Sequence, residues 1–210
     1  MTIFDWFQRR SRKKKSKQPP LPIPDQYMEQ HADDPIPNNL EKAVQLFTGL
    51  LEDSQFLTVR RFRLFGQFPA AMIYFSNMVD PEIKNADILR PLMYVPDHLA
   101  GTRIALKDLS DIVMNDALYY TGSERQQKMG KVILKLLRGG TAVLIDGLND
   151  AIVMETTKIA QRSIDQPETE QVIRGPREGF VEQLGTNISL LRYRLPTTDL
   201  KVKTMDLGRV

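Results

Sequence analysis

Few residues of this chain have the type and spacing that catalysis or metal binding requires. Its two histidines, His31 and His98, lie far apart, and neither has a second histidine at metal-ligand spacing. Asp146, Asp150 and Glu155 could supply oxygen ligands, but they lack the spacing of a calcium-binding loop, and turn formation explains these acids better. We therefore predict no catalytic residue, no metal site and no cofactor.

The glycine-containing motifs do not indicate an enzyme either. "RGG" at 138–140 and "RGP" at 174–176 lack the GxxxxGK[ST] and GxGxxG layouts that direct successive backbone amides at a phosphate. "GSE" at 122–124 lacks the second glycine of a nucleophile elbow. We expect a protein that works by interaction rather than by catalysis.

Composition narrows the class of protein further. The 210 residues are 41% hydrophobic, which is ample for a packed core, and contain no cysteine, which excludes disulfides, thiolate nucleophiles and cysteine-ligated zinc. No apolar run approaches the roughly 18 residues of a membrane-spanning helix. These residues are therefore expected to form a soluble globular portion.

The positive charge is concentrated at the amino terminus. The net charge is +3, yet the first 17 residues carry seven basic side chains against one acid: Arg9, Arg10, Arg12, Lys13, Lys14, Lys15 and Lys17. Prolines follow in "PPLPIP" and "DDPIP", so we expect a disordered basic leader over residues 1–37. It could be a solvated tail, or its aromatic and basic residues could lie on an anionic membrane surface; nucleic-acid binding is the least favoured alternative.

The remaining chain is expected to fold as two segments, 38–122 and 123–210. In the first segment we predict a helix from Asn38 or Asn39, a hairpin over 57–76 and a second helix that starts at Pro81. Pro91 should end this second helix early or kink it, and residues 97–123 are ambiguous. In the second segment we predict a helix capped by Ser123, a hairpin over 141–157, a helix after the RGP turn and a last strand over 200–207. The fold class predicted is α/β (α+β), with two small subdomains, each a mixed sheet flanked by helices.

The stretch 174–195 is the best candidate for an interaction site. Gly175 and Pro176 predict a turn, Gly179 and Phe180 follow, and Glu178 falls in the first helical turn, where a carboxylate complements the helix dipole. Helical spacing predicts one apolar core stripe: Phe180, Leu184, Ile188, Leu191 and Leu195. The polar side carries interface or ligand candidates, Arg174, Arg177, Thr186, Asn187 and Arg192, which are either solvated or hydrogen-bonded to the other half of the chain or to a partner.

Three segments resemble one family. "IRGPREGFVEQLGTNISLLRYRL", "LLRGGTAVLIDG" and "LKVKTMDLGR" closely resemble the A subunits of GerA-type nutrient germinant receptors, the spore germination proteins of endospore-forming bacteria. The resemblance is specific over residues 124–210 and rests on organisation over 38–123. Tyr193 departs from it, because relatives often have a basic residue there.

The resemblance implies a soluble amino-terminal portion on the cytoplasmic, spore-core side of a longer protein of the inner spore membrane. It implies B and C receptor subunits as partners and a nutrient germinant, an amino acid, sugar or ion, as the signal. It assigns no catalysis to this portion. We expect germinant sensing, signal coupling and subunit assembly; the alternative is a module that binds the germinant in a cleft between the two subdomains.

Overall fold

A computed structural model describes residues 31–51, 55–97, 101, 104–118, 120–158, 180, 182–203, 205 and 208. Most of the basic leader, His98 and the whole RGP turn with its flanking residues lie outside the described residues. The sequence predictions for Arg174, Gly175, Pro176, Arg177, Glu178 and Gly179 therefore stay predictions.

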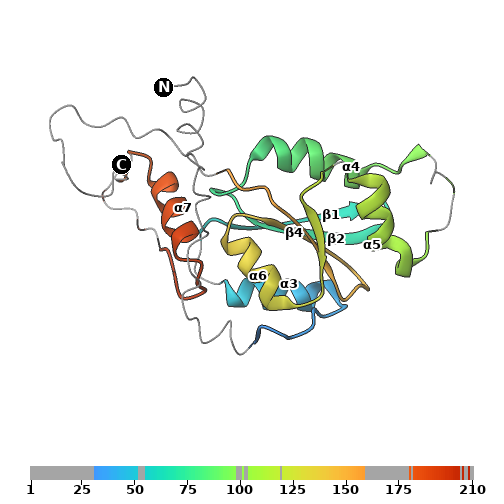
Figure 1. The fold of residues 1–210 in the computed structure, drawn as a ribbon, viewed down its shortest axis with the longest axis horizontal. Helices are drawn as coiled ribbons and strands as arrows, with labels where there is room; N and C mark the ends of the chain where they lie inside the picture. The colour runs from blue at the N-terminus through green and yellow to red at the C-terminus, as the bar shows by residue number, and fades with distance from the viewer. Residues whose placement is uncertain are drawn as a thin grey trace, which may run out of the picture.

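A five-stranded antiparallel sheet forms the centre of the fold (Figure 1). The strand order is β1 (Leu57–Leu64), β2 (Phe68–Phe75), β4 (Thr141–Ile145), β5 (Ala151–Met154) and β3 (Ser123–Gln126). β1 and β2 form one hairpin and β4 and β5 the other, so both predicted hairpins are confirmed. Together with the helices on its faces, the sheet confirms the α/β class.

The sheet joins the two halves of the chain. β2 from the first half pairs with β4 from the second, from Ala70 opposite Ile145 to Tyr74 opposite Thr141. The prediction of a separate mixed sheet in each half is therefore corrected to one antiparallel sheet. Each hairpin alone would leave an unpaired inner edge, and pairing the two satisfies those backbone groups and buries both central strands.

Two α-helices cover one face of the sheet. The helix α3 (Leu40–Leu50) is capped by the Asn39 side chain, which accepts a hydrogen bond from the Lys42 amide at 2.9 Å, as the sequence predicted. The helix α6 (Met129–Leu137) presents buried aliphatic residues to the same face. Phe47 of α3 is fully buried there beside Ile73 and Phe75 of β2. This cluster forms the first core of the protein.

The opposite face is covered by short helical segments. They are the π-helical η1 (Ile83–Leu89), α4 (Arg90–Met93), the 3-10 turn η3 (Leu106–Asp108), α5 (Leu109–Ile112) and the π-helical η4 (Val113–Ala117). The first helix changes from π to α geometry at Arg90 and continues to Met93. Pro91, which lacks an amide proton, follows this change of geometry directly, and the helix runs past it to Met93 instead of ending before it. Ile88, Leu92 and Leu109 are fully buried in this second core.

The end of the expected disordered leader is ordered instead. Residues 34–36 run antiparallel to 127–129: the Ile36 amide donates to the Gln127 carbonyl and the Met129 amide to the Asp34 carbonyl. Ile36 is only 2% exposed, because its side chain joins the first core cluster. The ordered body therefore begins before residue 38.

Three boundaries in the second half differ from the prediction. Ser123 starts strand β3 rather than capping a helix, and α6 begins at Met129 after Lys128. The last helix, α7 (Leu184–Arg194), begins well after the RGP turn. Among the described residues of 200–207, Val202 makes a single β-bridge and no strand follows β5. Pairing with strand β5 at the edge of the sheet, rather than local helical propensity, determines the conformation of residues 123–126.

Candidate functional site

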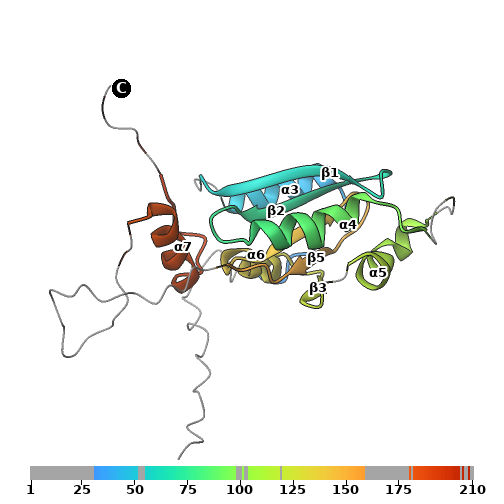
Figure 2. The same cartoon turned by 90° about the horizontal axis from the view of Figure 1, so that it is seen from above.

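The helix α7 lies at the end of the molecule opposite α5 (Figure 2). It carries three of the predicted interface residues, Thr186, Asn187 and Arg192. Its attachment to the sheet is the candidate functional site, and we call the residues that make it, Phe75, Asn77, Gly185, Ser189 and Arg192, the α7 joint.

Asn77, just after β2, holds the first turns of α7. Its side-chain amide donates to the Gly185 carbonyl at 3.3 Å. The Ser189 hydroxyl lies 2.6 Å from the Asn77 carbonyl and 2.8 Å from the Gly185 carbonyl, so it can donate its proton to either. Ser189 is 2% exposed, which removes water as a competitor for these bonds.

Arg192 holds the next turn of the helix. Its guanidinium stacks over the Phe75 ring, 4.5 Å from the ring centre, and donates to the Leu200 carbonyl at 3.0 Å. The residue is only 2% exposed, and this burial lowers the pKa of Arg192 to about 10. The guanidinium therefore stays protonated at neutral pH, and the Phe75 ring offers it an electron-rich face.

Arg192 contacts the other half of the chain by stacking on Phe75, whereas its hydrogen bond to Leu200 stays within its own half. The predicted apolar core stripe is wrong. Of its five residues only Ile188 is buried, whereas Phe180 is 73% exposed and Leu184 62% exposed. Leu191 and Leu195 are exposed as well. The helix packs through the side that carries Gly185, Ser189 and Arg192, because hydrogen bonds to Asn77 and the stacking of Arg192 on Phe75 fix its rotation.

The other two predicted residues lie beside the joint rather than in it. The amides of Thr186 and Asn187 donate to the Gln183 carbonyl at 3.1 and 3.2 Å, so both residues belong to the first helical turn. The Thr186 hydroxyl donates to the Gln183 side chain at 3.2 Å. Asn77 and Ser189 were missed by the sequence reasoning, since a lone asparagine after a strand and a serine within a helix have no distinctive spacing.

The acids considered as oxygen ligands serve the fold instead. Asp146 accepts the Leu40 amide at 3.0 Å, which ties α3 to the β4–β5 turn. Asp150 is 3% exposed, forms an ion pair with Arg125 and accepts the Ser110 hydroxyl at 3.2 Å. Within the described part of the chain, no group of three or more potential ligands is placed to hold a metal ion.

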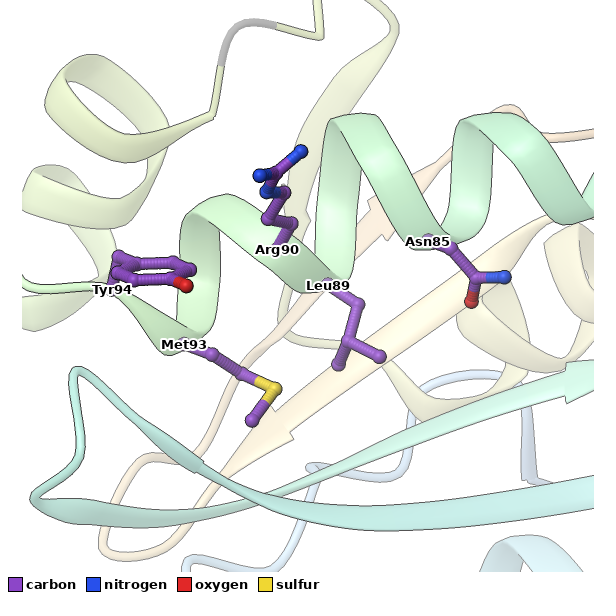
Figure 3. A pocket seen from close by; sticks show the side chains of 5 residues that line it. All are labelled: Asn85, Leu89, Arg90, Met93 and Tyr94. Atoms are coloured by element: carbon purple, nitrogen blue, oxygen red, sulfur yellow. The ribbon is translucent and has the colours of Figure 1, made fainter.

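A shallow hollow lies on the surface formed by η1 and α4 (Figure 3). It is lined by Asn85, Leu89, Arg90, Met93 and Tyr94. Arg90 points away from Leu89 and Met93, so the guanidinium and these apolar groups do not converge on one small ligand. At the boundary between the two expected subdomains, β2 and β4 are hydrogen-bonded to each other.

Comparison with known proteins identifies the family. A family model described as Bacillus/Clostridium GerA spore germination protein matches residues 45–210, which is most of the chain. The chain belongs to this family. The resemblance seen in the sequence is thereby confirmed.

Individual relatives agree with this assignment. Spore germination protein A1 of Bacillus subtilis is 41% identical over 65% of this chain and 26% of its own length. Spore germination protein B1 of the same organism is 30% identical over 84% of this chain and 35% of its length. The chain thus spans about a quarter to a third of these GerA-family relatives.

A crystal structure supports the fold. The amino-terminal domain of the A subunit of the Bacillus megaterium spore germinant receptor GerK3 matches with a TM-score of 0.62 and 22% identity, over 85% of this chain and 63% of that chain. At this identity the match establishes the fold. Among the described residues, no helix is both long and apolar enough to cross a membrane.

Proposed function

We propose that this chain serves as the amino-terminal domain of an A-type subunit of a nutrient germinant receptor, where it couples germinant sensing to the rest of the receptor. In this role it assembles with B and C subunits at the inner spore membrane, on the spore-core side, and the basic leader contacts the anionic lipid surface. It acts through binding and displacement, without catalysis. Membership in the GerA family and the similarity to the GerK3 domain support the assignment.

The α7 joint is the observation that carries the coupling role. A single sheet joins the two halves, so moving them apart would break the β2–β4 hydrogen bonds. The helix α7 is instead attached through hydrogen bonds at Asn77, the stacking of Arg192 on Phe75 and the packing of Ile188 and Tyr193, while its leucines remain partly or largely exposed. An element held in this way can change position at a modest free-energy cost, of the order of a few hydrogen bonds.

A partner can shift α7 only by binding its two positions with different affinity. Each 1.4 kcal/mol of difference, as a general relation, changes the population ratio about tenfold. Tight attachment of α7 favours the receptor state in which the helix lies against the sheet. Weakening the α7 joint should raise the population of the state in which the helix has moved. The direction of the effect on germination is set by which state is active.

Germination assays on spores that carry variants of the full-length subunit test this role. We expect Ser189→Ala and Arg192→Lys to change the germination rate in response to nutrient, while Thr186→Ala, which changes the same helix outside the joint, has little effect. Subunit abundance is measured by immunoblot in each strain. Normal germination by both joint variants at normal abundance would refute the coupling role.

Germinant binding by this domain is the second candidate. The hollow on η1 and α4 offers apolar Leu89 and Met93 together with the amide of Asn85, groups that suit a small amino acid or sugar. Calorimetry with nutrient amino acids and sugars should give saturable heat that Asn85→Ala and Met93→Ala reduce. Absence of heat with all of them would dismiss this candidate and leave the coupling role intact.

A further inference from the structure

Exposed apolar side chains are concentrated near α7. Ten large hydrophobic residues of the described chain are exposed, and five of them fall between residues 180 and 205: Phe180, Leu184, Leu191, Leu195 and Met205. This is a short part of the described chain. Single exposed apolar residues are ordinary on a protein surface, but a local group of this kind marks an interaction surface.

Two of these residues lie on one side of α7, and a third caps its end. Leu184 and Leu191 are seven positions apart, about two turns, and Leu195 follows four positions later as the C-cap, whereas Ile188, which lies between this arc and the side of the α7 joint, is buried. The three leucines are 62%, 38% and 38% exposed, whereas Ser189 and Arg192, on the side of the α7 joint, are each 2% exposed. One side of the helix therefore contacts the sheet, and another side exposes leucines.

The same segment carries an excess of positive charge. Between residues 182 and 203, four basic residues stand against the two acids Glu182 and Asp199. Arg194, Lys201 and Lys203 are exposed, and Arg192 is the buried one. Exposed leucines together with arginine and lysine are the combination that binds an anionic lipid surface, with the leucines entering the headgroup region and the cations contacting the lipid charges.

We propose that this surface, the α7 face formed by Leu184, Leu191, Leu195 and Arg194, together with Lys201 in the segment that follows the helix, binds the anionic headgroups of a membrane. A second copy of the chain fits the surface less well, because the excess positive charge of each copy would face that of the other. The contact is separate from any contact by the basic leader. The inference rests on the proposed coupling function, since α7 would then link the lipid surface to the sheet through Asn77 and Phe75.

Vesicle binding by the 210-residue chain tests the proposal. The leader is first neutralised by replacing Arg9, Arg10, Arg12, Lys13, Lys14, Lys15 and Lys17 with Gln, so that the remaining binding comes from the ordered body. We expect this protein to sediment with phosphatidylglycerol vesicles and not with phosphatidylcholine vesicles. Adding Leu184→Gln, Leu191→Gln and Leu195→Gln should lower the partition coefficient about tenfold or more.

A matched control separates this surface from general hydrophobicity. Leu46 on α3 is 43% exposed, similar to Leu191 and Leu195, so Leu46→Gln should leave the binding unchanged. Lys201→Glu should weaken it roughly tenfold, with less effect at high salt. Circular dichroism and urea unfolding establish that each variant is folded; if the triple variant is not, Leu184→Gln and Lys201→Glu each decide the outcome alone.

Three results would overturn the proposal. One is the absence of binding to phosphatidylglycerol by the leader-neutralised protein, and another is equal binding by the leucine variants. The third is a dimer, detected by light scattering, that the leucine substitutions dissociate while vesicles remain unbound, which would assign the surface to self-association. Vesicle binding does not involve germination, so a failure here leaves the germination test of the α7 joint to be decided separately.

Discussion

The guanidinium carbon of Arg192 lies 4.5 Å from the centre of the Phe75 ring. Phe75 ends strand β2 and is fully buried in the first core, while Arg192 lies near the end of α7. The stacking therefore joins the last helix directly to a central strand. Displacing the buried guanidinium from the ring should therefore have a measurable free-energy cost, because the cation must then find other partners.

The coupling between Arg192 and Phe75 can be measured by a double-mutant cycle. We expect Arg192→Ala to lower the free energy of unfolding by about 1–3 kcal/mol. Combined with Phe75→Leu, the cycle should give an interaction energy of about 0.5–2 kcal/mol, because the leucine keeps apolar volume but lacks the ring face. Urea unfolding of the four proteins provides the values. An interaction energy of zero would show that the contact contributes no stability.

The lowered pKa of Arg192 predicts a pH dependence at alkaline pH. The pKa is about 10 in the folded protein, well below that of an unperturbed arginine, so from about pH 10 upward the unfolded chain binds more protons at this residue. Stability from this group therefore rises with pH in that window. The difference in unfolding free energy between the natural protein and Arg192→Met should be constant from pH 6 to 9 and move in favour of the natural protein above pH 10. A constant difference up to pH 11 would contradict the shifted pKa.

The sequence predicts elements well where local pattern and burial agree. Asn39, one of the two cap candidates, and both hairpins were predicted correctly because the residues that favour each element are also those that face the core. The pairing of β2 with β4 could not be predicted, since two buried strands far apart in the chain carry no local signal of their partner.

The candidate site was predicted less well for a physical reason. Helical periodicity places apolar residues inward, but α7 is rotated by the hydrogen bonds of Ser189 to Asn77 and by the stacking of Arg192. Periodicity contains no information about such polar contacts between distant residues. Arg192 was singled out as a multiple donor, whereas Leu184 and Leu191 were assigned to a core that they do not enter.

Removing the Ser189 hydroxyl should loosen α7 locally. In Ser189→Ala one of the partly buried Asn77 and Gly185 carbonyls loses the hydroxyl donor, which costs about 0.5–1.5 kcal/mol. We expect faster amide hydrogen exchange in α7, with exchange in α3 and the central strands unchanged. Thr186→Ala, which removes a hydroxyl outside the α7 joint, is the control. Exchange that rises equally in α3 would show that the bond supports the whole fold rather than the attachment of α7.

The ion pair between Asp150 and Arg125 should contribute far more to the stability of the fold than the ion pair between Asp111 and Arg125. The Asp150 side chain is 2% exposed and also accepts the Ser110 hydroxyl, whereas Asp111 lies 3.6 Å from Arg125 and is 70% exposed. Asp150→Ala should lower the free energy of unfolding by about 1–3 kcal/mol, and Asp111→Ala by less than about 1 kcal/mol. Thermal unfolding compares the two variants. Equal effects would mean that burial of the carboxylate does not strengthen the pair.

A matched pair of glycine substitutions tests the packing of the segment before α3. At Gly130 a Cβ atom would lie 2.6 Å from the Ala32 Cα, so the backbone of residues 31–36 comes too close for any side chain. Gly130→Ala should displace this segment and break the contacts at Asp34 and Ile36, with an expected loss of about 1–3 kcal/mol. At Gly49, within α3, a Cβ meets nothing within 4 Å, and Gly49→Ala should stabilise the protein by about 0.5–1 kcal/mol through helix propensity. Urea unfolding of both variants should give opposite signs. If Gly130→Ala were as stable as the natural protein, the ordered segment at 31–36 would not be packed against α6 as described.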